Sequence, residues 1–280
     1  MEIKLFKNRI EVKKPCLFNI KKSLECGQIF RYLCKDNKYI VFEGKHKIEI
    51  EEDENYIKIF TKVPNRHINY FDLETKYDKI NSRISKINPL IEKAVEFGKG
   101  IRIFRQDFLE TLIGFVISAN NNIPRIRKSL FLLCERFGEN CGDYFAFPTL
   151  LALSKITLKQ WEELGVGYRA KSLVKVCSQL FEISEKELKE METASARKKL
   201  IELAGVGPKV ADCVLLFGLG KKDVFPTDTW VKKFYLQNFK ETENDAKKIS
   251  QILAKRFGED SGLIQQYIFY FKREKGDNYE

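Results

Sequence analysis

Apolar and charged residues alternate in the N-terminal part of the chain, and this alternation predicts β-strands. The clearest stretch covers residues 38–60, where Ile48, Ile50, Ile57 and Ile59 recur at every second position around a turn at 53–55. A period of two places successive side chains on opposite faces of a strand. The first hundred residues are therefore expected to form mainly hairpins of an antiparallel sheet, with one face buried and the other in water.

The period becomes helical from about residue 84. Between residues 105 and 119 the side chains of Phe108, Leu112, Phe115 and Val116 fall on one helical face. Further helices are expected at 124–138, where Pro124 marks a helix start, and at 158–164, 168–182, 185–203, 209–219, 228–238, 243–257 and 260–273.

No strand pattern interrupts this helical half. The predicted fold class is α+β, with an antiparallel β-rich N-terminal domain over residues 1–98 and an all-α domain over residues 99–280. The 280-residue length is compatible with one large domain or two modest ones.

Composition and charge point to a globular protein with a polyanionic partner. The chain is 44% hydrophobic and 32% charged, which is unlike a disordered protein. Its 50 Lys and Arg residues against 39 Asp and Glu residues give a net charge of +11. A basic balance favours nucleic acid, but lysine-rich chains are also often merely soluble, so the charge alone leaves both interpretations open.

The seven cysteines are scattered and form no CxxC pair. This argues against structural zinc, an iron–sulfur cluster and a secreted disulfide framework, and we expect buried thiols in a reducing cytosol. The charged N-terminus and the lack of a long apolar run predict no signal peptide and no membrane span. We therefore expect a soluble cytoplasmic protein without a metal.

The segment from Leu203 to Cys213, with sequence LAGVGPKVADC, predicts a tight hairpin between two helices, over about 196–219. Gly205, Val206 and Gly207 would present backbone N–H groups at the start of the second helix, where the helix dipole favours an anion such as a phosphate. This element resembles the helix-hairpin-helix of non-sequence-specific DNA-binding proteins. A glycine turn that only joins two structural helices remains the alternative.

Lys209 lies in the first turn of that second helix, where a positive charge is disfavoured. One interpretation is a phosphate contact. The other is that helix dipole and partial burial keep some of the amine neutral, so that it attacks a sugar carbon and forms a Schiff base. The hairpin by itself does not separate the two.

Asp228, within VFPTDTW, follows Lys209 by about twenty residues. A carboxylate at a helix start is commonly an N-cap. A hairpin lysine paired with an aspartate at this spacing also resembles the helix-hairpin-helix/Gly-Pro-Asp superfamily of DNA glycosylases. The resemblance implies that Lys209 is the nucleophile and that Asp228 stabilises positive charge on the sugar.

Further segments resemble the 8-oxoguanine DNA glycosylases within that superfamily. GQIFR at 27–31 resembles the GQxFR segment, whose glycine carbonyl accepts the N7–H that distinguishes 8-oxoguanine from guanine. The resemblance also implies that Gln265 reads the base edge, that Phe269 stacks on the base, and that Cys213 covers its other face. Taken singly, Gly27 would be a turn residue, and Phe269 and Cys213 would be core residues.

Two loops resemble the family segments that read the base opposite the lesion. SANNNIPR at 118–125 resembles NNNIxR and assigns Asn120 and Arg125 to the unpaired cytosine, and GVGYRA at 165–170 resembles GxGYRA. There Tyr168 would wedge into the base stack and Arg169 would contact the orphaned base. The structural alternatives are a polar loop at 118–125, a helix-packing role for Tyr168 and a solvent-exposed charge for Arg169.

One position departs from the family pattern, because Trp230 stands where a histidine near a phosphate is common. Neither His46 nor His67 is an obvious replacement. Cleavage by Lys209 and Asp228 need not depend on that histidine, whereas the DNA affinity does come into question.

The resemblance implies a bifunctional enzyme that flips 8-oxoguanine out of duplex DNA, excises it through a lysine Schiff base and nicks the strand by β-elimination. Its partner would be double-stranded DNA that contains 8-oxoguanine, and neither an organic cofactor nor an oligomer is required. Two alternatives stay open, namely a related glycosylase for another damaged base and a non-catalytic helix-hairpin-helix DNA-binding protein. A zinc deaminase is disfavoured, since HxE with a PCxxC partner does not occur.

Overall fold

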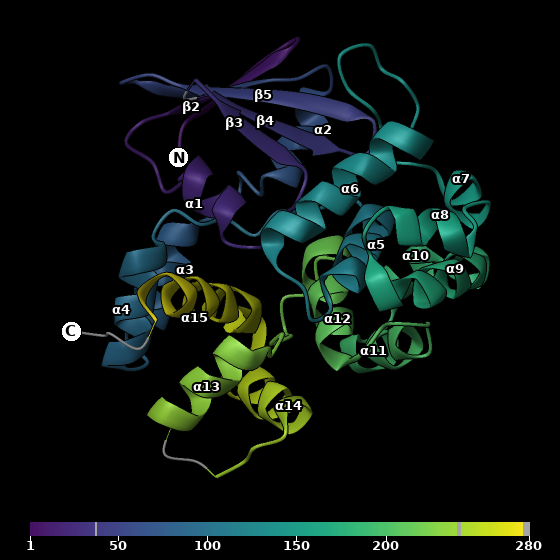
Figure 1. Cartoon of the computed structure of the whole chain (residues 1–280). Helices are drawn as coiled ribbons and strands as arrows, with labels where there is room; N and C mark the ends of the chain where they lie inside the picture. The colour runs from purple at the N-terminus through teal and green to yellow at the C-terminus, as the bar shows by residue number, and fades with distance from the viewer. Residues whose placement is uncertain (37, 240–241, 277–280) are drawn as a thin grey trace.

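A six-stranded antiparallel sheet forms the N-terminal part of the computed structural model, which describes residues 1–36, 38–239 and 242–276 (Figure 1). Its strand order is β1-β2-β6-β5-β4-β3. The strands are β1 (Ile3–Phe6), β2 (Arg9–Lys13), β3 (Tyr32–Lys35), β4 (Lys38–Glu43), β5 (His46–Glu52) and β6 (Tyr56–Phe60).

The predicted alternation is confirmed in β5 and β6. Ile48, Ile50, Ile57 and Ile59 are all fully buried, and Ile50 lies opposite Ile59 in the register. The intervening charged residues face outward because each side chain points away from its neighbour in a strand.

Helices occupy the remainder of the chain, and their bounds largely follow the helical period. They are α1 (Ile20–Glu25), α2 (Pro64–Tyr70), α3 (Tyr77–Ile84), α4 (Pro89–Gly98), α5 (Phe108–Ser118), α6 (Ile123–Phe137), α7 (Leu150–Ser154), α8 (Leu158–Glu163), α9 (Ala170–Gln179), α10 (Glu185–Glu190), α11 (Thr193–Ile201), α12 (Pro208–Cys213), α13 (Thr229–Asn238), α14 (Ala246–Phe257) and α15 (Ser261–Lys275).

Two expectations about the helices are wrong. Helical structure begins before residue 84, since α1, α2 and α3 lie in the N-terminal part. The helix expected over 185–203 is broken at Met191, whose backbone is extended. The Lys221 ammonium donates to the carbonyls of Lys189 and Met191, which compensates the end of α10 from outside the segment.

The buried side chains form two clusters, and the division between them does not follow the order of the chain. One lies under the sheet and includes Ile48 but also Phe104. The other extends through the helices and includes Tyr77 but also Phe30 from the N-terminal part. Helices α3 and α4 thus pack with the helical part, where α4 lies against α15. The domain boundary at residue 98 stays a prediction.

The sheet is tied to the helical part through α5 and α6. Glu110 of α5 accepts from the Arg31 guanidinium at 3.1 Å and from the backbone N–H of Gly44 at 2.9 Å. Phe131 of α6 meets Phe42 of β4 edge to face. Figure 1 shows α6 running below the sheet. Within the described ranges, no helix is long and apolar enough to cross a membrane.

Candidate active site

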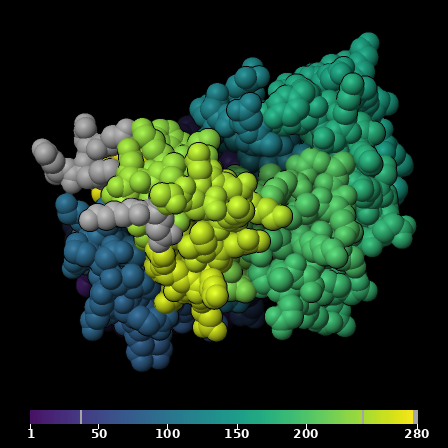
Figure 2. All heavy atoms as spheres, turned by 90° about the horizontal axis from the view of Figure 1, so that it is seen from below, coloured from purple at the N-terminus to yellow at the C-terminus, as the bar shows by residue number. Residues whose placement is uncertain are grey.

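One pocket opens between four segments that are distant in the sequence, namely the turn after α1, α5, the region from α12 to the start of α13, and α15. The residues assigned from the sequence to bond cleavage and base recognition all line it: Gly27, Lys209, Cys213, Asp228, Gln265 and Phe269. Seen from below, the C-terminal helices lie beside the green helices of the hairpin region (Figure 2). The fold thus brings these six residues together, while their individual roles stay predictions.

The hairpin between α11 and α12 places Lys209 at the pocket. Gly205 has φ = +79°, and a Cβ atom there would lie 2.8 Å from Ser172 Cβ, so this position requires glycine. The Val206 side chain is buried and its N–H donates to the Leu203 carbonyl. The Val206 N–H thus has a partner within the hairpin, and phosphate binding at Gly205, Val206 and Gly207 stays a prediction.

A buried carboxylate fixes the orientation of α12. Asp212 accepts from the Arg197 guanidinium of α11 at 2.6 Å and from the Ser250 hydroxyl of α14 at 2.8 Å. Burial raises the pKa of Asp212, and the Arg197 charge partly offsets this shift. Because three helices meet at this side chain, the first turn of α12 is held relative to the C-terminal helices.

The Lys209 side chain is partly buried, with its Nζ 5.0 Å from the centroid of the Phe115 ring. One turn further, the Cys213 thiol is buried. Burial raises the pKa of Cys213 to about 11, against the opposing effect of the Lys209 charge. The thiol is therefore neutral near pH 7 and offers the pocket a small apolar surface.

Asp228 is both the N-cap of α13 and a pocket residue. Its Oδ1 accepts from the Val231 N–H at 2.9 Å. Burial raises the pKa of Asp228, while the Val231 N–H and the charge of Lys209 act in the opposite direction. Asp228 therefore does act as a helix N-cap. The cap holds the carboxylate in one orientation beside the pocket, which Lys209 also lines.

The opposite wall is formed by Gly27 and α15. Gly27 has φ = +85°, and a Cβ atom there would lie 3.0 Å from Cε1 of Phe269. Gln265 is 5% exposed, and its Oε1 atom has no hydrogen-bond partner among the described residues. A buried, unpaired carbonyl oxygen is costly in a folded protein, so it favours a ligand that donates to it.

The residues expected to read the opposite base lie outside this pocket. Tyr168 is 68% exposed and its hydroxyl donates to the Ala119 carbonyl at 3.2 Å. The Arg169 side chain is buried, and its guanidinium donates to the carbonyls of Ala119, Asn120 and Val166. Arg169 therefore joins the two loops, and its contact with an orphaned base stays a prediction.

Asn120, in the turn between α5 and α6, and Arg125, in the first turn of α6, are both exposed. Asn120 has φ = +49°, a conformation that asparagine tolerates better than most residues. Asn122 caps α6 through the Arg125 N–H, and Pro124 sits in the first turn, where no backbone donor is needed. Pro124 is thus accommodated without distorting the helix.

Four residues of the pocket were not assigned a site role from the sequence: Phe115, Phe217, Pro226 and Gln266. Phe217 lies in a π-helical turn over Val214–Gly218 that follows α12, and its ring stacks on Phe115 at 5.6 Å. The period of 3.6 residues does not predict such a turn. Pro226, in contrast, could have been found from the sequence, because it lies two residues before Asp228 in the same motif.

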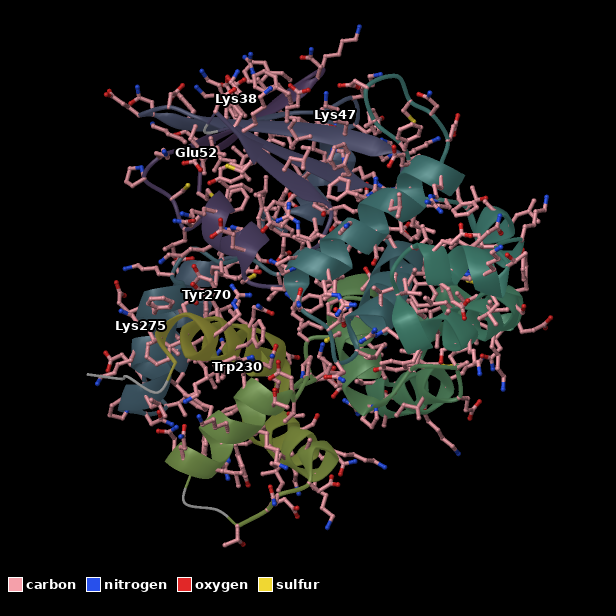
Figure 3. All side chains as sticks on the ribbon, viewed as in Figure 1. Lys38, Lys47, Glu52, Trp230, Tyr270 and Lys275 are labelled. Atoms are coloured by element: carbon pink, nitrogen blue, oxygen red, sulfur yellow. The ribbon has the colours of Figure 1, made fainter. Side chains whose placement is uncertain are left out.

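The two histidines do not replace the one that the family pattern commonly has. His67 is buried on α2 beside His46, and neither lines the pocket. Trp230 is 40% exposed at the start of α13, as its label shows in Figure 3. Over the described ranges, His, Cys, Asp and Glu side chains form no group of three or more that could hold a metal ion.

The chain is similar to one family of known proteins in both sequence and structure. The family model described as "8-oxoguanine DNA glycosylase, N-terminal domain" matches residues 9–112. A solved structure of an 8-oxoguanine glycosylase/lyase from Clostridium acetobutylicum, bound to double-stranded DNA with cytosine opposite 8-oxoguanine, is 36% identical. Its TM-score is 0.91, and the match covers 98% of each chain.

Curated relatives carry the same activity in their names. The N-glycosylase/DNA lyase of Saccharomyces cerevisiae is 32% identical over 282 residues, which cover 87% of this chain and 73% of the relative. An N-glycosylase/DNA lyase of Arabidopsis thaliana is 30% identical over 223 residues, with 72% and 60% covered.

Proposed function

The chain belongs to the family of 8-oxoguanine DNA glycosylases with DNA lyase activity, and from this premise we propose how its own residues carry out the reaction. The enzyme excises 8-oxoguanine from double-stranded DNA and then cleaves the strand at the abasic site. The observation that carries the mechanism is that a lysine amine and a capped, partly buried carboxylate line one pocket together with the residues proposed to recognise the base.

Lys209 is the proposed nucleophile. Its neutral amine forms a bond to C1′ of the deoxyribose as the bond from C1′ to N9 of the base breaks, and the base leaves with that electron pair and takes up a proton. Loss of the amine proton and opening of the sugar ring give an imine. Removal of a C2′ proton then breaks the C3′–O bond and cuts the strand on the 3′ side of the lesion.

Asp228 stabilises the positive charge that develops on the sugar when the base departs. The Val231 N–H and the start of α13 hold its carboxylate in place before substrate arrives, so the reaction requires little reorganisation at this group. Asp228 has to be ionised for this role, because stabilisation of a cationic sugar requires its negative charge.

Base recognition is assigned to Gly27, Gln265, Phe269 and Cys213. The Gly27 carbonyl would accept the N7–H of 8-oxoguanine, whereas guanine presents a bare acceptor at N7 and is repelled. Gln265 would pair with the base edge, which gives its buried Oε1 atom a donor. Phe269 and Cys213 would cover the two faces of the ring.

The duplex is gripped outside the pocket. Gly205 and Gly207 at the hairpin are proposed to bind backbone phosphates, with an affinity that falls as the salt concentration rises. Tyr168 is proposed to fill the gap left by the extruded base, which offsets part of its unstacking. Asn120 and Arg125, with Arg169, are proposed to contact the cytosine opposite.

The test uses duplexes that each contain one defined base, namely 8-oxoguanine opposite each of the four bases, an alkylated purine and guanine. Base release, strand cleavage and covalent trapping with borohydride are measured on each. We expect excision and trapping with 8-oxoguanine. Preference for another damaged base would overturn the substrate, and DNA binding without release or trapping would leave only a DNA-binding protein.

A further inference from the structure

In the turn after α1, over residues 25–28, most backbone carbonyl groups accept hydrogen bonds from side chains of other segments. Arg273 Nη2 donates to the Glu25 carbonyl at 2.6 Å, and Gln266 Nε2 donates to the Cys26 carbonyl. Gln106 Nε2 donates to the Gln28 carbonyl at 2.7 Å. Three of four consecutive carbonyl groups are therefore each occupied by a side chain from a distant part of the chain.

The fourth carbonyl, that of Gly27, accepts no hydrogen bond from any residue that the structure describes. Gly27 lines the pocket, where its neighbours are the Phe269 ring and the Arg273 guanidinium. The surrounding donors thus satisfy the turn on both sides of Gly27 and leave one acceptor beside the pocket. Gly27 is partly buried, and its carbonyl is therefore available to accept a hydrogen bond from a donor on a ligand in the pocket.

Both donors from α15 lie on one helical face. Gln266 and Arg273 are seven residues apart, which is about two turns, and the neighbouring stripe carries Gln265 and Phe269. The Arg273 guanidinium also lies over the Phe269 ring, 5.5 Å from its centroid. One helix therefore holds both the stacking ring and the turn that carries the Gly27 carbonyl.

We propose that Gln266 and Arg273 are positioning residues for the Glu25–Gln28 turn. They hold the turn so that only the Gly27 carbonyl is available to the extruded base. In this way they set the discrimination between 8-oxoguanine and guanine. This inference rests on the proposed function. Neither side chain has to touch the reacting atoms. Their effect passes through the Gly27 carbonyl, whose hydrogen bond to N7–H is lost if the turn rotates or the peptide flips.

The proposal separates two activities of the same protein. Excision of 8-oxoguanine needs the Gly27 carbonyl, because a base has to be read before it is released. Strand cleavage at a preformed abasic site needs Lys209 but has no base to read. A loss of positioning at Gly27 should therefore lower excision and leave cleavage at abasic sites almost unchanged, whereas a general loss of structure would lower both.

Gln266→Leu removes the donor to Cys26 at nearly constant volume. We expect single-turnover excision from an 8-oxoguanine:cytosine duplex to fall ~10–100-fold, as for other displaced reactive or reading groups, with abasic-site cleavage within ~3-fold of the parent. Arg273→Met should act in the same direction. Arg273→Lys keeps a donor and a charge and should recover part of the loss.

Tyr267→Phe is the matched control. It deletes one buried hydrogen bond from the same helix, the 2.9 Å bond from the Tyr267 hydroxyl to Asn81 Oδ1, which lies on α3 and away from the turn. Its ratio of excision to abasic-site cleavage should equal that of the parent. If Gln266→Leu is poorly folded by thermal unfolding, the partly exposed Arg273 supplies the decisive variant.

A second measurement tests discrimination directly. In a Lys209→Gln background, binding to 8-oxoguanine:cytosine and guanine:cytosine duplexes is compared, and Gln266→Leu should lower the ratio of the two affinities ~10-fold or more. Equal losses of excision and abasic-site cleavage, or an unchanged affinity ratio, would overturn the positioning role. Failure of the unsubstituted protein to excise 8-oxoguanine would instead overturn the proposed function itself.

Discussion

The two walls of the pocket differ in how they are built and in what they are suited to do. The first carries Lys209 and Asp228 and comes from one stretch of chain around α12 and the start of α13. The second carries Gly27 and Phe269 and joins the turn after α1 to α15. In the proposed mechanism the first wall supplies chemistry at the sugar, which every damaged nucleotide shares, and the second wall recognises the base. Substitutions in the first wall should therefore abolish bond cleavage, whereas substitutions in the second wall should lower the selectivity for the damaged base.

The largest effect is expected on the sugar side. Lys209→Gln removes the amine while keeping a polar side chain of similar length, so both base release and strand cleavage should fall at least ~10³-fold, because no imine can form. Borohydride trapping on the 8-oxoguanine duplex is the measurement. A covalent adduct formed by this variant would show that the nucleophile is another residue.

Asp228→Asn separates the charge of this residue from its role as a cap. Asparagine caps helices about as well as aspartate does, so the bond to the Val231 N–H should persist and the melting temperature should not fall. Excision should drop ~10²-fold, because the developing sugar cation loses its counter-charge. Single-turnover rates and thermal unfolding are measured together, and a large fall in the melting temperature would mean that the carboxylate is mainly structural.

Gly27→Ala tests the base-reading wall. An alanine at φ = +85°, with its Cβ 3.0 Å from the Phe269 ring, would be strained and would displace the ring or the turn. We expect 8-oxoguanine excision to fall ~10–100-fold and the free energy of unfolding to decrease by ~1–2 kcal/mol. Cleavage at abasic sites should be nearly retained. A parallel loss of both activities would erase the distinction between the walls.

The smallest expected effect is a pH dependence that belongs to the sugar side alone. Burial raises the pKa of Asp228 above that of an ordinary aspartate, so excision should decline with acid at a higher pH than for an exposed carboxylate. This acid decline is measured from single-turnover excision rates as a function of pH. Gly27→Ala should keep it, and Asp228→Asn should lack it.

Linkage gives the same group a stability signature of known sign. Because the folded-state pKa of Asp228 is raised, its contribution to stability is present below the unfolded pKa and is lost as the pH rises through the folded pKa. Asp228→Asn should therefore flatten this part of the dependence of unfolding free energy on pH. An unaltered dependence would mean that burial of this carboxyl has no energetic consequence.

The amino-acid sequence by itself determined the elements with a regular period and the features that lie close together along the chain. The isoleucines of β5 and β6 alternate because one face of a sheet is buried, and the hairpin with Lys209 is recognisable from two glycines and a proline within a few positions. Asp228 follows within about twenty residues, so the sugar-side wall could be predicted from one local segment.

Only the tertiary structure decided the features that depend on contacts between distant segments. The residues Gln266 and Arg273 meet the turn around Gly27 only after folding, and no period in the sequence marks them as its donors. The break at Met191 is compensated by Lys221 from outside the segment, and the Val206 N–H is paired within the hairpin itself. Hydrogen bonds over such separations are set by packing of whole elements, which local residue preferences do not encode.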